Sequence, residues 1–402
     1  MSTTMTESQT DTQYNNQNYY SSRDNNFASS PNNKKSQKYN KKINSHKIQN
    51  NQTKNSQKKN INIKNNNDDN NYNSIQKKNN NSQTNTYNDI KYHTILDEKD
   101  QAYWGYLPVA ICVFLWLITC AAPPLTLLFF YLEFYKISLF IFTSFVVCYV
   151  PASIYRPMKE WFREGCAKYF KQTTLTVEEG CDILDSKIKT MVPVHPHGIF
   201  CLSWTTMFLR KEFERLHYCF SAMLNQGYFR LFVSLMGKTS CVGKKYMTQL
   251  MEKGESVALI PGGFEEGSFH TYGLEQTYLK SKFGFVKLAL KYGYSLTPVY
   301  GFKECFTFHN IKGFDNMKKF CSKWSVPFCL FWGNNLAPML PQRQHGLHIV
   351  IGKSMKLPQI KNPSKEEVQY YHAKYLDEVN NLFERHKSRF YENPNDVKLI
   401  II

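Results

Sequence analysis

The fold of this chain is decided by the segment IKTMVPVHPHG, residues 188–198. Its first part, from Ile188 to Val194, is short and mainly apolar, which predicts a buried β-strand. The strand ends in two histidines that flank a proline and precede a glycine. Because proline pushes the residue before it into an extended conformation, His195 has little freedom. We therefore expect a strand end that holds imidazole groups in a fixed geometry.

Strands and helices alternate around this segment. Apolar runs at 256–260, 295–300 and 347–351 predict further strands, and helical spacing follows at 199–210 and 285–291. A capping box at 363–367 predicts the start of a long amphipathic helix. The alternation predicts an α/β domain over residues 152–402, with a mainly parallel sheet covered by helices. In such sheets the chemistry gathers where strands end and helices begin.

The His-Pro-His-Gly turn is the first candidate site. His195 or His197 could serve as a general base for a hydroxyl proton, because imidazole titrates near neutral pH. Gly198 permits a tight turn, and N–H groups at the start of the following helix could hold an oxyanion. The alternative is a structural turn with hydrogen-bonded histidines. Two histidines two positions apart lack a third ligand nearby, so we expect no metal.

A second turn follows the strand predicted at 256–260. It has the sequence PGGFEEG, residues 261–267, and its glycines let the backbone approach a substrate. Glu266 or Glu265 could orient a histidine, as the acid of a catalytic triad does. The alternative is a tight turn with solvated glutamates.

Four lysines surround Gly284 and Phe285, and they could hold the phosphates of coenzyme A. They are Lys280, Lys282, Lys287 and Lys291. The alternative is a solvated helix face.

Two apolar runs precede the α/β domain, at 107–132 and 137–150. The first is long enough to cross a bilayer, and Pro123-Pro124 within it should kink or break the helix. Together they predict a transmembrane or re-entrant helical hairpin over residues 104–151. Basic residues lie on both flanks, which places both flanks in the cytosol by the positive-inside rule. The alternative is a pair of buried core helices.

The charge and composition differ along the chain. Residues 1–100 are rich in Asn, Gln, Ser and Lys, which predicts a disordered cytosolic tail. The formal charge is +18, and a third of this excess lies in the tail. A cationic domain suits anionic lipid headgroups or a phosphorylated co-substrate.

The polar N-terminal residues argue against a signal peptide. The 11 cysteines contain no CxxC pair, which indicates reduced thiols.

These motifs, in this order, resemble the type-2 diacylglycerol acyltransferase family, which includes monoacylglycerol acyltransferases and wax synthases. The resemblance covers residues 103–398. Lys282 stands where the family usually has arginine. The resemblance implies His195, His197 and Glu266 as catalytic residues. It implies substrate contacts from Pro196, Gly198, Arg230, Pro261, Gly262, Gly263, Lys282, Gly284, Phe285 and Lys287.

The reaction that the resemblance implies is esterification of diacylglycerol by acyl-CoA, which is a co-substrate, with no resident cofactor. The implied setting is the endoplasmic reticulum membrane, with the active site and termini cytosolic, and the hairpin would also allow movement to lipid droplets. The expected partners are the lipid bilayer and the two substrates, and homo-oligomers are compatible with the sequence. We expect no nucleic-acid partner.

Three other interpretations stay open. The acceptor could be monoacylglycerol or a fatty alcohol. The chain could instead be a non-catalytic lipid-binding membrane scaffold. RNA binding by the Asn/Lys-rich tail is the third interpretation, and it would make binding by residues 1–95 sensitive to salt.

Overall fold

A nine-stranded sheet runs through the domain. The computed structural model describes residues 91–323 and 328–402. The strands of the sheet are β1 (Tyr92–Glu98), β2 (Thr173–Glu178), β3 (Thr190–His195), β4 (His217–Phe220), β5 (Thr239–Cys241), β6 (Val257–Leu259), β8 (Ser295–Leu296), β9 (Val299–Phe302) and β12 (Leu347–Ile351). Their order is β1-β2-β12-β9-β3-β6-β4-β5, with β8 also paired to β3.

The sheet is parallel through its centre and mixed toward one edge. The β1–β2 and β12–β9 pairs are antiparallel. The remaining pairs of this sheet are parallel. The α/β class predicted from the sequence is therefore confirmed. The strand predicted at 295–300 is interrupted, since β8 and β9 flank Thr297-Pro298 and proline has no N–H to donate to a ladder.

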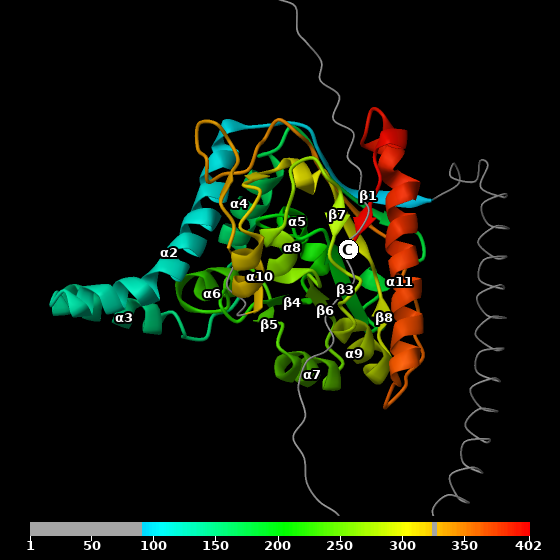
Figure 1. Ribbon diagram of the computed structural model, residues 1–402, viewed down its shortest axis with the longest axis horizontal. Coiled ribbons are helices and arrows are strands. Elements are labelled where there is room, and N and C mark those ends of the chain that lie inside the picture. Colours follow the sequence, from blue (N-terminus) through cyan, green and yellow to red (C-terminus); the bar gives the residue numbers. More distant parts are fainter. Residues whose placement is uncertain (1–90, 324–327) are drawn as a thin grey trace, which may run out of the picture. The chain divides into compact units, whose positions relative to one another are not determined.

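Helices alternate with the strands along the chain, as expected from the sequence pattern (Figure 1). They are α4 (Arg156–Ala167), α5 (Leu202–Phe208), α6 (Gly227–Ser234), α7 (Lys244–Glu252), α8 (Gly263–Ser268), α9 (Gly284–Tyr292), α10 (Asp315–Lys323) and α11 (Lys365–His386). Two small two-stranded sheets pair β10 (His309–Asn310) with β11 (Phe331–Trp332), and β7 (Gln276–Thr277) with β13 (Ile400–Ile401). The predicted capping box is present at the start of α11, between Ser364 and Glu367.

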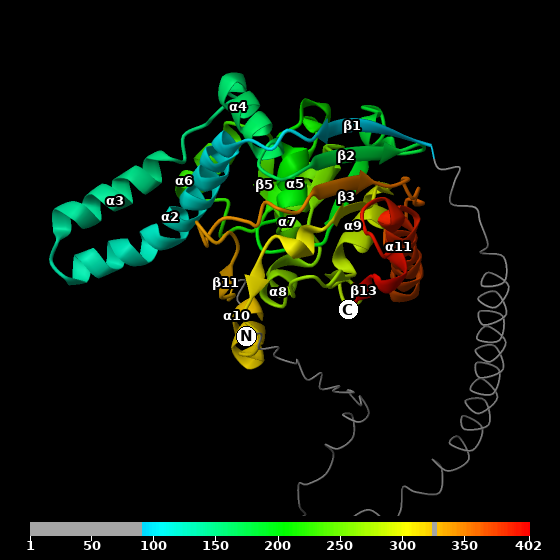
Figure 2. The same ribbon diagram turned by 90° about the horizontal axis from the view of Figure 1, so that it is seen from above.

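The predicted hairpin is formed by α2 (Tyr106–Tyr131) and α3 (Tyr135–Val147), which project together from the sheet (Figure 2). The helical stretch Tyr103–Tyr131 is long and apolar enough to cross a membrane. Large apolar side chains, Phe130 and Phe140 among them, are exposed on both helices. Of the two outcomes expected at Pro123-Pro124, a kink or a break, the break does not occur, because α2 continues through both prolines. The chain turns instead at Glu133, which has a φ of 64°.

The tail predicted for residues 1–100 lies for the most part outside the described residues. Its last part differs from the prediction, since Tyr92–Glu98 form β1. This segment is held by antiparallel pairing with β2 along six register positions, from Tyr92 opposite Glu178 to Glu98 opposite Thr173. Ile95 and Leu96 also pack against the hydrophobic core. The ordered domain therefore starts before the apolar hairpin.

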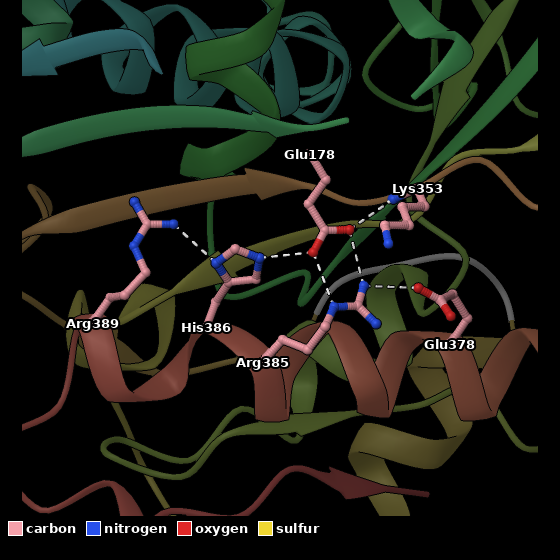
Figure 3. Close-up of polar contacts among 6 residues, drawn as sticks. All are labelled: Glu178, Lys353, Glu378, Arg385, His386 and Arg389. Atoms are coloured by element: carbon pink, nitrogen blue, oxygen red, sulfur yellow. Dashed lines mark hydrogen bonds and ion pairs between the residues drawn. The ribbon is translucent and has the colours of Figure 1, made fainter. Parts of the chain in front are cut away.

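A buried polar network joins α11 to the end of β2 (Figure 3). The Glu178 carboxylate, 1% exposed, accepts hydrogen bonds from Arg385 at 3.0 and 2.9 Å, from His386 Nε2 at 2.8 Å and from the Lys353 N–H at 2.9 Å. Burial alone would raise the pKa of Glu178, but the bonds from His386 and Arg385 lower it to about 2. Arg389 donates to His386 Nδ1 at 2.9 Å. Because arginine only donates, His386 accepts from Arg389 at Nδ1 and donates to Glu178 from Nε2.

Candidate active site

The His-Pro-His-Gly turn lies where β3 ends, in the middle of the sheet between β9 and β6. His195 is the last residue of β3 and is fully buried, with 0% exposed. Its Nε2 lies 2.8 Å from the hydroxyl of Tyr375 on α11. Burial lowers the pKa of His195 to about 3. This imidazole is therefore neutral and faces α11.

His197 has different surroundings. It is partly exposed and lines a large cavity. Its Nδ1 lies 2.9 Å from the carbonyl oxygen of Gly198. A carbonyl only accepts, so Nδ1 carries the proton and Nε2 keeps a lone pair. Nε2 has no hydrogen-bond partner in the described part of the chain, and burial lowers the pKa of the ring. His197 thus presents the unprotonated nitrogen that a general base needs.

Glu266, on α8, acts on the backbone of the turn. Its buried carboxylate accepts hydrogen bonds from the main-chain N–H of His197, from Thr277 Oγ1 at 3.0 Å and from the Tyr278 N–H at 2.9 Å. Burial raises the pKa of this carboxyl, while these donors act in the opposite direction. The sequence suggested that Glu266 could orient an imidazole. In the structure Glu266 bonds to the main-chain N–H of His197 and not to the imidazole ring.

The glycines of the second turn make room for this contact. A Cβ at Gly262 would lie 1.9 Å from Glu266 Oε2, so any larger residue there would displace the carboxylate. A Cβ at Gly267 would lie 3.0 Å from His197 Nδ1. The Gly-Gly-x-x-Glu pattern therefore has a steric cause, because the glycines let the carboxylate fold back under the histidine turn.

Glu304 is a site residue that the sequence reasoning missed. It is fully buried and accepts hydrogen bonds from the N–H groups of Leu202 and Ser203, both at 2.8 Å, and from the Ser203 hydroxyl. A Cβ at Gly198 would lie 2.8 Å from its Oε1. Burial raises the pKa of Glu304 to about 7. The available signal was its position four residues after the end of the strand predicted at 295–300.

The contacts of Glu304 change the expected oxyanion site. We expected N–H groups at the start of the helix after the histidine turn, which is α5, but Leu202 and Ser203 already donate to Glu304. The N–H groups of Gly263 and Phe264, in the first turn of α8, have no acceptor within the described residues. Both residues lie on the wall of the cavity that His197 also lines. The second turn is therefore the better candidate for an oxyanion site.

The cavity has a volume of about 1410 Å³. Its walls are mainly apolar and include Val109, Cys112, Val113 and Trp116 of α2, together with Phe229, Phe232 and Val233 of α6. Eight of the thirteen site residues that the resemblance implies line it, namely His197, Pro261, Gly262, Gly263, Lys282, Gly284, Phe285 and Lys287. His195, Pro196, Gly198, Arg230 and Glu266 are not on its wall.

Two of the predicted cationic residues already have partners. Arg230 donates to the carbonyl oxygen of Cys148 at 2.9 Å, and its guanidinium lies 5.2 Å from the centre of the Tyr149 ring. It thereby ties α6 to the end of the hairpin. Lys282 forms an ion pair with Glu265 at 2.6 Å. Among the described residues, no group of three or more His, Cys, Asp and Glu side chains could hold a metal ion.

Comparison with known proteins identifies the family. A family model described as diacylglycerol acyltransferase matches residues 126–402. The chain therefore belongs to the diacylglycerol acyltransferase family, as the resemblance indicated. No solved structure gives a significant match.

Several curated relatives carry different substrate names. Acyl-CoA wax alcohol acyltransferase 2 of Mus musculus is 34% identical over 39% of this chain and 51% of the relative. Diacylglycerol O-acyltransferase 2 of Dictyostelium discoideum is 33% identical over 37% of this chain and 48% of the relative. Human 2-acylglycerol O-acyltransferase 3 is 30% identical over 48% of this chain and 63% of the relative. The match to the first two spans about half of each relative.

Proposed function

We propose that this chain transfers the acyl group of acyl-CoA to the free hydroxyl of diacylglycerol, which gives triacylglycerol. The observation that carries the proposal is the free Nε2 of His197 on the wall of a large apolar cavity. Membership of the diacylglycerol acyltransferase family supports the reaction class. Acyl-CoA is a co-substrate here, and no resident cofactor is part of the proposal.

In the proposed mechanism the acyl group passes directly between the two substrates. His197 Nε2 takes the proton of the acceptor hydroxyl while the oxygen attacks the thioester carbonyl. The N–H groups of Gly263 and Phe264 donate to the oxyanion that forms. The C–S bond then breaks, and the coenzyme A thiolate receives the proton from His197. A base of this kind contributes roughly 10²–10⁴ in rate, and one oxyanion donor roughly 10²–10³.

The position of α2 supports a lipid acceptor. Its first half contributes Val109, Val113 and Trp116 to the cavity wall, whereas its second half and α3 expose large apolar side chains. Exposed apolar surface of this extent marks a membrane or a partner. We propose that the hairpin anchors the domain on the cytosolic face of the endoplasmic reticulum, and lipid droplets are a second site compatible with it.

The length of the exposed part favours insertion into one leaflet. α2 is packed against the domain as far as Ala122, which is buried. Only Pro123 to Tyr131 extend beyond it, a rise of about 13 Å, and α3 adds a return of about 20 Å. Both are shorter than the roughly 30 Å hydrocarbon core. A protease-sensitive tag inserted next to Glu133 would stay protected in intact microsomes and in inside-out vesicles alike, whereas a full span would expose it on one side.

The acceptor is tested by supplying labelled oleoyl-CoA to membranes from cells that cannot make triacylglycerol and that express the full chain. Diacylglycerol, monoacylglycerol and hexadecanol are offered in parallel. We expect the highest turnover with diacylglycerol. The wax alcohol and 2-acylglycerol acyltransferases among the relatives make the other two acceptors the second candidate. Absence of ester product from all three would favour the non-catalytic scaffold.

A further inference from the structure

Six lysines line the cavity, and four of them come from three neighbouring parts of the chain. These four are Lys244 on α7, Lys287 and Lys291 on α9, and Lys361 in the loop before α11. We propose that they bind the phosphorylated adenosine part of coenzyme A, its pyrophosphate and its ribose 3′-phosphate. This inference rests on the proposed function and names the anion site of that reaction. Neither Lys244 nor Lys361 was a candidate in the sequence.

The backbone brings these elements together. The N–H of Ile360 donates to the carbonyl oxygen of Leu290 at 2.9 Å, which places Lys361 beside the C-terminal end of α9. The Tyr292 hydroxyl donates to Glu252 at 3.2 Å, which joins α9 to α7. Lys287 and Lys291 are four residues apart and so share one side of their helix. Figure 1 shows α7, α9 and the start of α11 at the same end of the domain.

The charge of this end is not compensated within the described residues. None of the four lysines forms an ion pair there, whereas Lys282 is already held by Glu265. Lys244 also occupies the first position of α7, and Gly243 supplies no side-chain cap. A cation at a helix N-terminus is electrostatically unfavourable, while an anion there is stabilised. An anionic ligand would neutralise the unpaired lysines and would also stabilise the N-terminus of α7.

The cavity connects this anion site to the proposed base, because His197 and the four lysines line the same space. Coenzyme A is charged at its adenosine end and carries its thioester at the other. Phosphates at the lysines would direct the thioester toward His197 and Gly263. The apolar walls near α2 would then be left for the acyl chain and the acceptor.

The first test compares acyl-CoA with acyl-3′-dephospho-CoA as donors for the full chain in detergent micelles. We expect Lys287→Ala/Lys291→Ala to raise KM for acyl-CoA about tenfold at nearly constant kcat, since each exposed ion pair is worth up to about fivefold in affinity. KM for the dephospho donor should rise less. The control is Lys245→Ala, because Lys245 is exposed on the same turn of α7 as Lys244 but does not line the cavity.

The second test measures binding of adenosine 3′,5′-bisphosphate to the same protein by calorimetry, without any turnover. Binding that the double variant weakens and Lys245→Ala does not would support the site even if no acyl transfer were detected. Normal turnover without such binding, or equal KM increases for both donors, would overturn it. If the double variant lost binding to phosphatidylserine vesicles but kept bisphosphate binding, the lysines would serve a lipid headgroup and the proposal would be wrong.

Discussion

Glu266 accepts a hydrogen bond from the main-chain N–H of His197 and makes none with its imidazole. The carboxylate therefore fixes the position of the histidine through the backbone. This differs from a catalytic triad, in which the acid binds the ring of the base. The tautomer of His197 is instead selected by the carbonyl oxygen of Gly198.

Replacement of Glu266 should therefore affect kcat more than KM. In Glu266→Gln one of the three donors would face an NH₂ group, and an unsatisfied buried donor costs roughly 1–3 kcal/mol. We expect kcat to fall about 10- to 100-fold. The matched control is Glu265→Gln, which loses only the ion pair with Lys282 and should stay within about threefold. Equal losses in the two variants would contradict the positioning role.

The two histidines should respond differently to substitution. His197→Ala removes the proposed base and should lower kcat by roughly 10²–10⁴ while the melting temperature is unchanged. His195→Ala removes a buried ring bonded to Tyr375 and should lower the melting temperature. Tyr375→Phe should reproduce part of that loss of stability. Normal kcat in His197→Ala protein that is folded would exclude His197 as the base.

Gly262→Ala tests the steric account of the second turn. The added Cβ would lie 1.9 Å from Glu266 Oε2, so the carboxylate that holds the His197 N–H must shift. We expect a kcat loss similar to that of Glu266→Gln. Because the two changes act on one contact, the double variant should be no worse than either single variant. Additive losses would show that Gly262 acts in another way.

The Glu178 network predicts a loss of stability at acid pH. The folded pKa of Glu178 is about 2, below its ordinary value of 4.5. The folded state thus binds this proton less readily than the unfolded state, so the stabilisation is full above about pH 4.5 and disappears as pH falls toward 2. At pH 7, Glu178→Gln should cost about 3–5 kcal/mol in unfolding free energy, because it leaves Arg385 with less compensation. Glu378→Gln, at the more exposed end of the same arginine, should cost much less.

Glu304 predicts the opposite pH dependence. Its folded pKa of about 7 lies above the ordinary 4.5. Between these values the folded state keeps a proton that the unfolded state has lost, so this group makes the fold less stable as pH rises through that window. Because glutamine does not titrate, the melting temperature of Glu304→Gln relative to wild type should be higher at pH 8 than at pH 4.5. A constant difference at both pH values would exclude titration of Glu304 as the cause.

Local sequence patterns were sufficient for the elements whose stability is local. The strand before His195, the capping box at Ser364 and the apolar hairpin were all predicted, because each has its own periodicity or capping residue. The contacts that define the site were not predictable in this way. Glu304 and Tyr375 are distant in sequence from the turn that they contact, and no spacing rule connects them. The different roles of His195 and His197 likewise depend on which ring faces α11 and which faces the cavity.

Helix α2 has one half in the cavity wall and the other half exposed beyond the domain. If the exposed half lies in a bilayer, as proposed, the acceptor can reach His197 by lateral diffusion and never enters bulk water. Turnover would then depend on the mole fraction of diacylglycerol in the membrane surface, and diluting the vesicles at fixed lipid composition would leave it unchanged. The same helix would also transmit changes in lateral pressure to the volume in which the ester bond forms.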